Sequence, residues 1–225
     1  MAVARTAASR AIADVTFGAL RAIADVTFGA LRVVLWQNRG VSAVTELLIR
    51  PAAATDVEPL AELAAETFPL ACPPHTTAEA VADFVARNFL PEHFASHLAD
   101  PDRIVLVAER SDGTSARLVG YSMLVGGEPG DADAAAAVAA RPAIELSKFY
   151  TRADEHGGGI AAPLMAATLD AAGATGAIAC WLGVNEQNAR AIRFYEKHGF
   201  AKAGRKHFTV GGRLENDWVL AQPLG

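Results

Sequence analysis

The sequence predicts an α/β fold in which helices flank a mixed sheet, mostly antiparallel, with one parallel pair of strands. Two observations lead to this prediction. The apolar runs 104–108 and 118–125 are joined through Ser-Asp-Gly turn chemistry, which indicates an antiparallel hairpin. Later, a strand pattern over 143–151 is followed by a helical stretch and by the wholly apolar run 177–182. A strand of that kind, reached through a helical crossover, indicates a parallel pair buried on both faces.

Composition and charge narrow the class of protein. The 225 residues are 52% hydrophobic, which is enough for a folded core. A formal net charge of −5 disfavours a nucleic-acid partner and is compatible with cationic substrates. Cys72 and Cys180 are far apart and lack metal-ligand spacing, so we expect reduced thiols and no metal. Without a long apolar run or a signal-peptide pattern, we expect a cytoplasmic protein with no membrane partner.

The N-terminal part carries a duplication, because RAIADVTFGAL at 10–20 is repeated unchanged at 21–31. An 11-residue period is close to three helical turns, so one interpretation is a helix with Ile12, Phe17, Ile23 and Phe28 along a slowly drifting face. The other is a duplicated tail, since a solenoid needs more and longer repeats. We expect residues 1–45 to be a poorly ordered extension and residues 46–225 to form one domain.

Local patterns predict the first half of that domain. A strand over 47–51 is ended by a proline, and Thr55 and Asp56 are expected to cap a helix over 57–68. Apolar residues at helical spacing predict two further helices between residues 76 and 98. Residues 126–141 mix glycine, acids and alanine in a connection longer than most, which indicates a mobile or functional loop.

A glycine-rich turn, His156-Gly157-Gly158-Gly159-Ile160-Ala161, precedes a helix predicted over 163–172. Its glycines allow successive N–H groups to point into one concavity at a helix N-terminus, where phosphates bind favourably. The turn is also compatible with a simple tight loop. It is neither a Walker loop nor a dinucleotide fingerprint, because it lacks the Gly-Lys-Ser/Thr of the first and the spacing of the second.

The run from Asn188 to Gly199 predicts a helix that carries Asn188 and Tyr195 two turns apart on one face. An amide and a phenol placed in this way could contact the same elongated ligand. Equally, Asn188 could be an N-cap, Tyr195 a core residue and Gly199 a helix stop. The helix alone does not decide between these interpretations.

Together, the segments resemble the GNAT superfamily of N-acetyltransferases. The resemblance rests on the strand Glu145-Leu-Ser-Lys-Phe-Tyr-Thr151, the Arg/Gln-x-x-Gly-x-Gly/Ala-like turn at 156–161 and the N-x-x-A-x-x-x-Y-x-x-x-G-F-like helix ending at Phe200. Residues 66–102 also look like members related to bacterial spermidine/spermine acetyltransferases. The resemblance implies about seven mostly antiparallel strands with a splayed parallel central pair, flanked by about four helices.

The resemblance also implies a binding site for acetyl-CoA as co-substrate, without a metal. The strand around Phe149 and Thr151 would pair with the pantetheine arm, the turn amides would hold the pyrophosphate, and Asn188 would hydrogen-bond the pantetheine. His156 departs from the arginine or glutamine usual at its position. The implied cofactor-binding residues are Phe149, Thr151, His156, Gly157, Gly158, Gly159, Ile160, Ala161 and Asn188.

Two residues are implied in catalysis. An alkylamine with a pKa near 10 must lose a proton before it can attack a thioester, and Glu145 could accept that proton or be only a solvated edge carboxylate. Tyr195 is placed to protonate the leaving thiolate as general acid. Strand amides near Phe149 would stabilise the developing oxyanion. Ser147, Cys180 and His198 lack the partner spacing of a nucleophile or base, so we expect packing or surface roles.

The acceptor is expected to be the primary amine of a small molecule. Acidic residues in segments that could border its pocket favour a polyamine or another cationic amine, unless they are simply solvated; these are Glu66, Glu128, Asp131 and Asp133. A protein or peptide N-acetyltransferase, with an open groove, and a non-catalytic acyl-CoA sensor are the alternatives. A homodimer is compatible with the resemblance.

Overall fold

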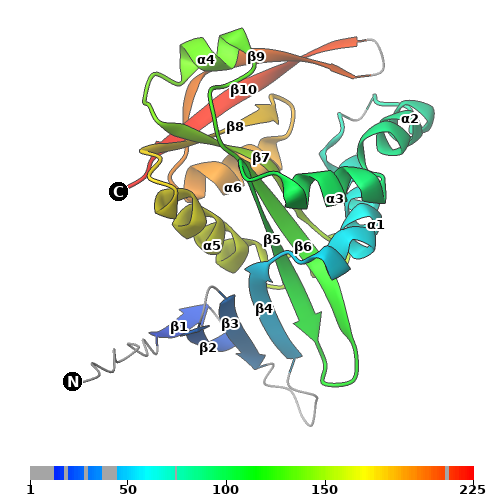
Figure 1. Ribbon diagram of the computed structural model, residues 1–225, viewed down its shortest axis with the longest axis vertical. Coiled ribbons are helices and arrows are strands. Elements are labelled where there is room, and N and C mark those ends of the chain that lie inside the picture. Colours follow the sequence, from blue (N-terminus) through cyan, green and yellow to red (C-terminus); the bar gives the residue numbers. More distant parts are fainter. Residues whose placement is uncertain (1–12, 18–19, 28–29, 37–44, 74, 211–212) are drawn as a thin grey trace, which may run out of the picture.

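The computed structural model describes residues 13–17, 20–27, 30–36, 45–73, 75–210 and 213–225. Its described strands form one sheet in the order β1-β2-β3-β4-β5-β6-β7-β8-β10-β9 (Figure 1). Neighbouring strands are antiparallel except β7 and β8, which are parallel. The predicted mixed sheet with one parallel pair is therefore confirmed.

The strands from residue 45 onwards are β4 (Thr45–Pro51), β5 (Arg103–Ser111), β6 (Ala116–Val125), β7 (Ala143–Thr151), β8 (Ala179–Asn185), β9 (Ala201–Val210) and β10 (Arg213–Pro223). The α-helices are α1 (Val57–Thr67), α2 (Ala78–Asn88), α3 (Pro91–Ala99), α4 (Ala132–Ala137), α5 (Ala161–Ala174) and α6 (Ala189–Lys197). Short 3-10 turns lie at Ala54–Asp56, Phe68–Ala71 and Ala153–Glu155.

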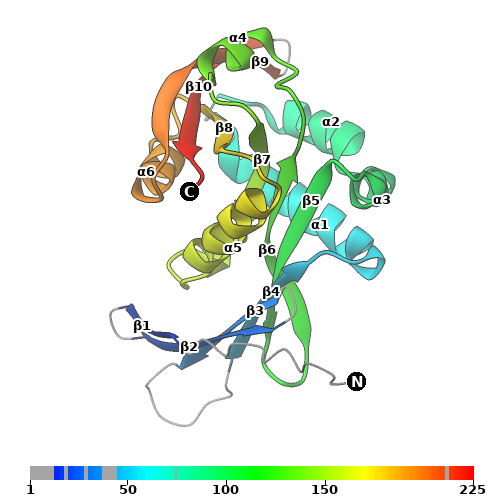
Figure 2. The same ribbon diagram turned by 60° about the vertical axis from the view of Figure 1, so that its left-hand side comes forward.

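The helices cover both faces of the sheet. Along β5, Val105 and Val107 belong to the core cluster with α1 and α3, whereas Leu106 and Ala108 belong to the cluster with α5. This alternation follows from the two-residue period of a strand. Figure 2 shows α5 and α6 on one side of the sheet and α1 and α3 on the other. Both faces of β5 are therefore buried, which explains its apolar sequence.

The connection between β6 and β7 contains the short helix α4, which the sequence analysis treats as a loop. Asp131 caps it, since its side chain accepts a hydrogen bond from the amide of Ala134 at 2.8 Å. Ala134 packs in one cluster with Trp181 and Val219. The alanine run has high helix propensity, and burial against the sheet stabilises a helix too short to form alone.

The cap expected at the start of α1 is not formed by the side chain of Asp56. Its carboxylate instead accepts hydrogen bonds from Arg50 at 2.6 and 2.9 Å and from the amide of Ala53 at 2.7 Å. Arg50 also contacts Glu109 at 2.6 Å. A guanidinium offers a charge-assisted bidentate contact, which is stronger than a cap to a helix amide. This ion pair fixes the start of α1 to β4.

The described part of the N-terminal segment consists of strands: β1 (Ala13–Phe17), β2 (Leu20–Thr27) and β3 (Ala30–Trp36). β3 pairs with β4, with Leu31 opposite Ile49. The helical interpretation of the repeat is therefore wrong for Phe17 and Ile23, while Ile12 and Phe28 lie outside the described residues. The division of the chain at residue 45 stays a prediction.

Deleting residues 1–45 tests that division. The described core clusters contain residues from Leu47 onwards, so we expect the shortened chain to keep a cooperative thermal transition and nearly full activity. The exposed edge of β4 should lower solubility at high concentration. Circular dichroism melts and size-exclusion chromatography against the full chain provide the measurement. Loss of the cooperative transition would show that β1 to β3 are integral to the fold.

Candidate functional site

The parallel pair of β7 and β8 is short. Its register runs only from Ala143 opposite Ala179 to Glu145 opposite Trp181. Beyond that point β7 continues along β6 and β8 continues along β10. A register shift against β6 leaves Ser147 as an extra residue in β7, and a bulge of this kind bends a strand. The two strands therefore diverge, and among the described strands none pairs with this edge of β7 after Glu145.

A cavity of about 460 Å³ lies at this divergence. Its walls come from β7, the end of β8, α6, the segment 67–73 after α1, and the β9–β10 hairpin. Seven of the residues proposed from the sequence line it: Glu145, Phe149, Thr151, His156, Ala161, Asn188 and Tyr195. Gly157, Gly158, Gly159 and Ile160 are not among the lining residues, and the Ile160 side chain is buried in the core beside α5.

The glycine turn leads directly into α5. Gly157 and Gly159 have φ values of +83° and +78°, a region that residues with a side chain rarely adopt. Within the described residues, the amides of Gly157, Gly159 and Ile160 donate no hydrogen bond. Free N–H groups at the start of a 14-residue helix form an anion-binding position. The sequence prediction of such a concavity is consistent with this geometry.

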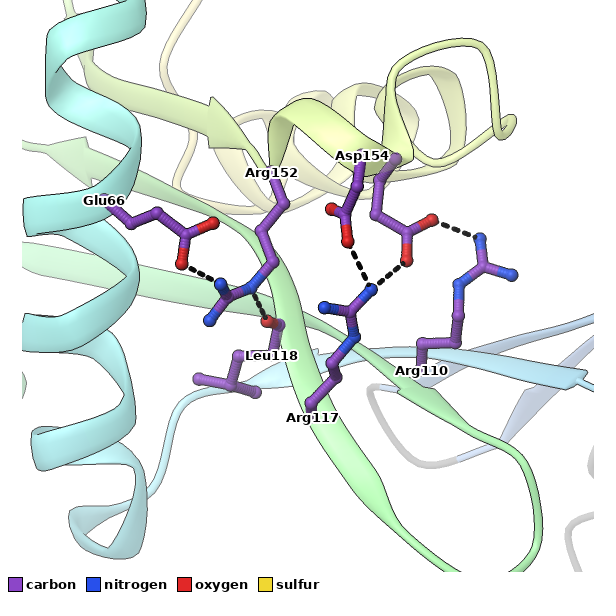
Figure 3. A network of polar contacts seen from close by, with 7 residues as sticks. Glu66, Arg110, Arg117, Leu118, Arg152 and Asp154 are labelled. Atoms are coloured by element: carbon purple, nitrogen blue, oxygen red, sulfur yellow. Dashed lines mark hydrogen bonds and ion pairs between the residues drawn. The ribbon is translucent and has the colours of Figure 1, made fainter.

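A network of ion pairs holds the residues before the turn (Figure 3). The buried carboxylate of Glu155 contacts Arg110 at 2.9 Å and Arg117 at 3.0 Å. Arg117 also contacts Asp154 at 2.9 Å. Arg152 donates to the carbonyl of Leu118 at 2.9 Å and pairs with Glu66 of α1. These contacts fasten the turn to the β5–β6 hairpin and to α1.

Gly158 lies against the same network. Its amide donates to the carbonyl of Glu155 at 2.9 Å. A Cβ atom at this position would lie 3.0 Å from that carbonyl oxygen and 3.2 Å from the Glu155 carboxylate. A side chain would therefore push the turn away from the ion pairs. Gly158 thus allows the turn to pack closely against Glu155, whereas Gly157 and Gly159 adopt the positive φ angles.

Tyr195 lies on α6 beside the open edge of β7. Its ring makes edge contacts with Phe149 of β7 at 6.4 Å, with Phe194 at 5.6 Å and with Phe200 at 5.8 Å between centroids. Burial raises the pKa of the Tyr195 phenol above its ordinary value, so the hydroxyl keeps its proton at neutral pH. The contact with Phe149 joins α6 to β7.

Asn188 caps α6 and also lines the cavity, so its role as N-cap does not exclude the expected contact with a ligand. Its side-chain oxygen caps α6 by accepting a hydrogen bond from the amide of Ala191 at 3.0 Å. The residue also lines the cavity. With the oxygen held by the cap, the side-chain amino group makes no hydrogen bond to another described residue, so it can serve as a donor to a ligand.

Glu145 is the last residue of β7 that pairs with β8, and it lines the cavity. Burial raises the pKa of its carboxyl, and the nearby charges of Lys206, Lys148 and Arg103 oppose that rise. Glu145 is therefore half-buried and faced by cations, unlike a solvated edge carboxylate. A carboxylate with a raised pKa is a stronger base than an exposed one.

The sequence analysis missed three charged residues of the β9–β10 hairpin that line the cavity: Lys206, Glu215 and Asp217. Glu215 contacts His75 at 2.6 Å, and burial raises the pKa of Asp217. In β10, Glu215 and Asp217 alternate with Asn216 and share a face with the buried Val219. Carboxylates on the apolar face of a strand are the signal that could have identified them.

The four acidic residues expected near the acceptor pocket do not line the cavity. Glu66 pairs with Arg152, and Glu128 contacts Arg141 at 2.7 Å. Asp131 caps α4, and Asp133 contacts His207 at 3.2 Å. That expectation is corrected: these carboxylates serve local structure, and the carboxylates of the cavity come from β7 and β10.

The remaining nucleophile candidates have structural surroundings. Cys180 is fully buried, and burial raises the pKa of its thiol to about 12. Both cysteines are free, as predicted. His198 Nδ1 lies 2.8 Å from the carbonyl oxygen of Phe194. Ser147, at the bulge of β7, lines the cavity but makes no hydrogen bond with the described residues that would activate it.

The described part of the chain shows neither a metal site nor a membrane-spanning helix. No cluster of three or more histidine, cysteine or acidic residues there could hold a metal ion. None of the described helices has the length and apolar character needed to cross a membrane.

Comparison with known sequences places these features in a family. The family model described as the acetyltransferase (GNAT) family matches residues 58–200. An uncharacterized N-acetyltransferase of Mycobacterium tuberculosis is 45% identical over 170 residues, which is 76% of this chain and 99% of the relative.

Solved structures agree with the fold. The PaiA N-acetyltransferase of Thermoplasma acidophilum, in complex with coenzyme A, has a TM-score of 0.61 at 19% identity and covers 79% of this chain and 98% of its own. The spermidine/spermine N-acetyltransferase of Vibrio cholerae has a TM-score of 0.53 at 17% identity and covers 79% and 92%. At these identities the likeness concerns the fold alone.

Proposed function

This chain belongs to the GNAT family of N-acetyltransferases, and we propose that it transfers an acetyl group from acetyl-CoA to the primary amine of a small cationic molecule, such as a polyamine. Family membership makes it an acyltransferase that uses acyl-CoA and an acceptor; the acetyl group, the acceptor and the site residues are the proposal. The observation that carries it is the divergence of β7 from β8 beside a cavity lined by Tyr195 and Glu145.

The open edge of β7 suits the pantetheine arm of acyl-CoA, which carries amides able to pair with a strand backbone. Phe149 and Thr151 belong to this part of β7 and line the cavity, as does Asn188 at the start of α6. The free amides of the 157–161 turn would hold the pyrophosphate at the start of α5. His156 lines the cavity and would add a side-chain donor where the family usually has arginine or glutamine.

Glu145 is the proposed general base. Most of an alkylamine is protonated at neutral pH, and only the neutral amine can attack the acyl carbonyl. Glu145 would accept the proton directly or through water, and its raised pKa improves it as a base. Amides of β7 near Phe149 would donate to the carbonyl oxygen as negative charge develops there.

Tyr195 is the proposed general acid. The departing thiolate needs a proton, and the buried phenol keeps its own at neutral pH. The packing of its ring against Phe149 and Phe200 fixes the direction of the hydroxyl. Base and acid then act on one bound pair of substrates, so transfer proceeds directly, without a covalent enzyme intermediate.

Three basic side chains, Lys148, Arg190 and Lys206, line the cavity beside three carboxylates, and it is the burial of those carboxylates that supports a cationic acceptor. The carboxylates are Glu145, Glu215 and Asp217, and Glu215 and Asp217 are buried at 5% and 9% relative exposure. Buried carboxylates attract a cation more strongly than exposed ones because solvent screens them less. An acceptor with two or more ammonium groups can present one amine for reaction and place another near these side chains.

A thiol-release assay with acetyl-CoA and a panel of polyamines, aminoglycosides, amino acids and peptides tests the proposal. We expect polyamines or another class of small cationic amine to give turnover. Turnover with peptides alone would instead identify a protein N-acetyltransferase. No release with any acceptor would refute the acetyl transfer proposed here.

Replacing Tyr195 by phenylalanine tests the general acid. Tyr195→Phe should lower kcat by about 10²–10⁴-fold and leave acetyl-CoA affinity nearly unchanged, because only the proton donor is lost. Tyr150→Phe is the matched control, since Tyr150 also lines the cavity but its ring stacks on Tyr121 in the α1 cluster. An unchanged rate in Tyr195→Phe, or a larger loss in Tyr150→Phe, removes Tyr195 from the mechanism.

The pH dependence of kcat/KM tests Glu145. A general base must be ionised, so activity should fall as the pH drops through its pKa, which burial places above the ordinary carboxyl value. Glu145→Gln should lose this acidic limb and about 10²–10⁴-fold of the neutral rate. Glu128→Gln, at an exposed carboxylate outside the cavity, is the control. If the acidic limb persists in Glu145→Gln, another group is the base.

A further inference from the structure

Lys206 of β9 occupies an unusual position in the cavity. Its side chain lies across Gly183 of β8, so that a Cβ atom on that glycine would be 2.4 Å from Lys206 Cε and 3.0 Å from Nζ. The same point is 3.6 Å from Asp217 Oδ2. Any residue other than glycine at position 183 would displace the ammonium group. The chain thus leaves room on β8 for this lysine.

The ammonium of Lys206 lies among carboxylates without binding one closely. Within the described residues it forms no ion pair at 4.0 Å or less, and its nearest ring is Trp181, at 6.0 Å. It is nevertheless the largest opposing charge on both Glu145 and Asp217. All three residues line the cavity. The ammonium group of Lys206 therefore shares the cavity with the two carboxylates that would attract the acceptor, and it lies beside Asp217 at Gly183.

The register of the β9–β10 hairpin places Lys206 on the face of the sheet that borders the cavity. Lys206 pairs with Asp217, and Gly204 pairs with Val219, but a bulge at Ala203 then moves Lys202 opposite Leu220. Lys202 stacks on Trp218 at 4.3 Å, and Trp218 points away from the face of its neighbour Asp217. Two lysines of one strand thus lie on opposite faces, and Lys206 is the one inside the cavity.

We propose that Lys206 is a specificity-determining residue that acts as an internal cation, holding the place near Glu145 and Asp217 that a charged group of the acceptor takes over. This inference rests on the proposed function and deepens it. An arriving ammonium group competes with Lys206 for the same carboxylates, and the lysine swings off Gly183 as the acceptor binds. Acceptors with more positive charges face more repulsion from Lys206 before it moves.

Removing the charge should therefore improve binding of polycations. In Lys206→Met we expect the KM for a diamine to fall by about two- to fivefold, the range for one partly screened charge. The fall should be smaller for a monoamine and larger for a triamine. Lys206→Arg, which keeps the charge, should retain the wild-type order of KM values. Lys202→Met removes the same charge from the same strand, outside the cavity, and should change no KM.

The experiment is steady-state acetylation of butylamine, putrescine and spermidine by the full chain, with thiol release as readout and binding of each amine by calorimetry in parallel. Equal KM changes in Lys206→Met and Lys202→Met would overturn the inference, as would a change independent of acceptor charge. A raised KM for a carboxylate-bearing amine, such as an amino acid, in Lys206→Met would also overturn it, because Lys206 would then bind an anion.

These outcomes are separate from failure of the proposed function. If wild-type protein acetylates none of the amines, the proposed function fails. Calorimetry then still decides the inference: tighter binding of spermidine to Lys206→Met than to wild type would support it, and equal binding would reject it. If the amines are acetylated and Lys206→Met leaves every KM unchanged, the function stands and the role of Lys206 is rejected.

Discussion

The site depends on one constraint, which is that β7 and β8 stop pairing after three residues. A buried strand edge must satisfy its backbone groups, and here the edge of β7 beyond Glu145 faces a cavity. The bulge at Ser147 bends β7 away, and β8 remains bound to β10. Both strands are held by their outer neighbours, so the gap is part of the fold itself. Tyr195, Asn188 and the glycine turn all border this gap or lie beside it.

The rest of the fold keeps that gap in shape. Glu155, bound by Arg110 and Arg117, fixes the glycine turn at one end. At the other end, α4 covers the face of the sheet that carries Trp181 and Val219. Farther along β8, at Gly183, the same face borders the cavity. The polar groups that border the gap also differ between its two ends. The half proposed for the cofactor offers backbone donors, whereas the half proposed for the acceptor carries Glu145, Glu215 and Asp217, with Lys206 among them.

The parts of the site predictable from sequence are those encoded locally. The strand 143–151, the turn at 156–161 and the helix with Asn188 and Tyr195 each have a signal within a few residues, and the structure forms a strand, a turn into α5 and a helix at these positions. Residues brought in by distant pairing were missed: Glu215 and Asp217 lie on the apolar face of β10, but nothing near them in the sequence shows that this face reaches β7. Glu66 was wrongly expected near the acceptor pocket, because its partner Arg152 lies far along the chain. The helix α4 depends on burial that no local pattern reveals.

Amide hydrogen exchange with and without coenzyme A measures the central claim most directly, because it reports on the backbone itself. The account predicts slower exchange in residues 146–151 of β7 and in the 157–161 turn when the ligand is bound, with little change in β5 or in α3. If coenzyme A binds but protects neither segment, or does not bind at all, the gap between β7 and β8 is not the acyl-CoA site.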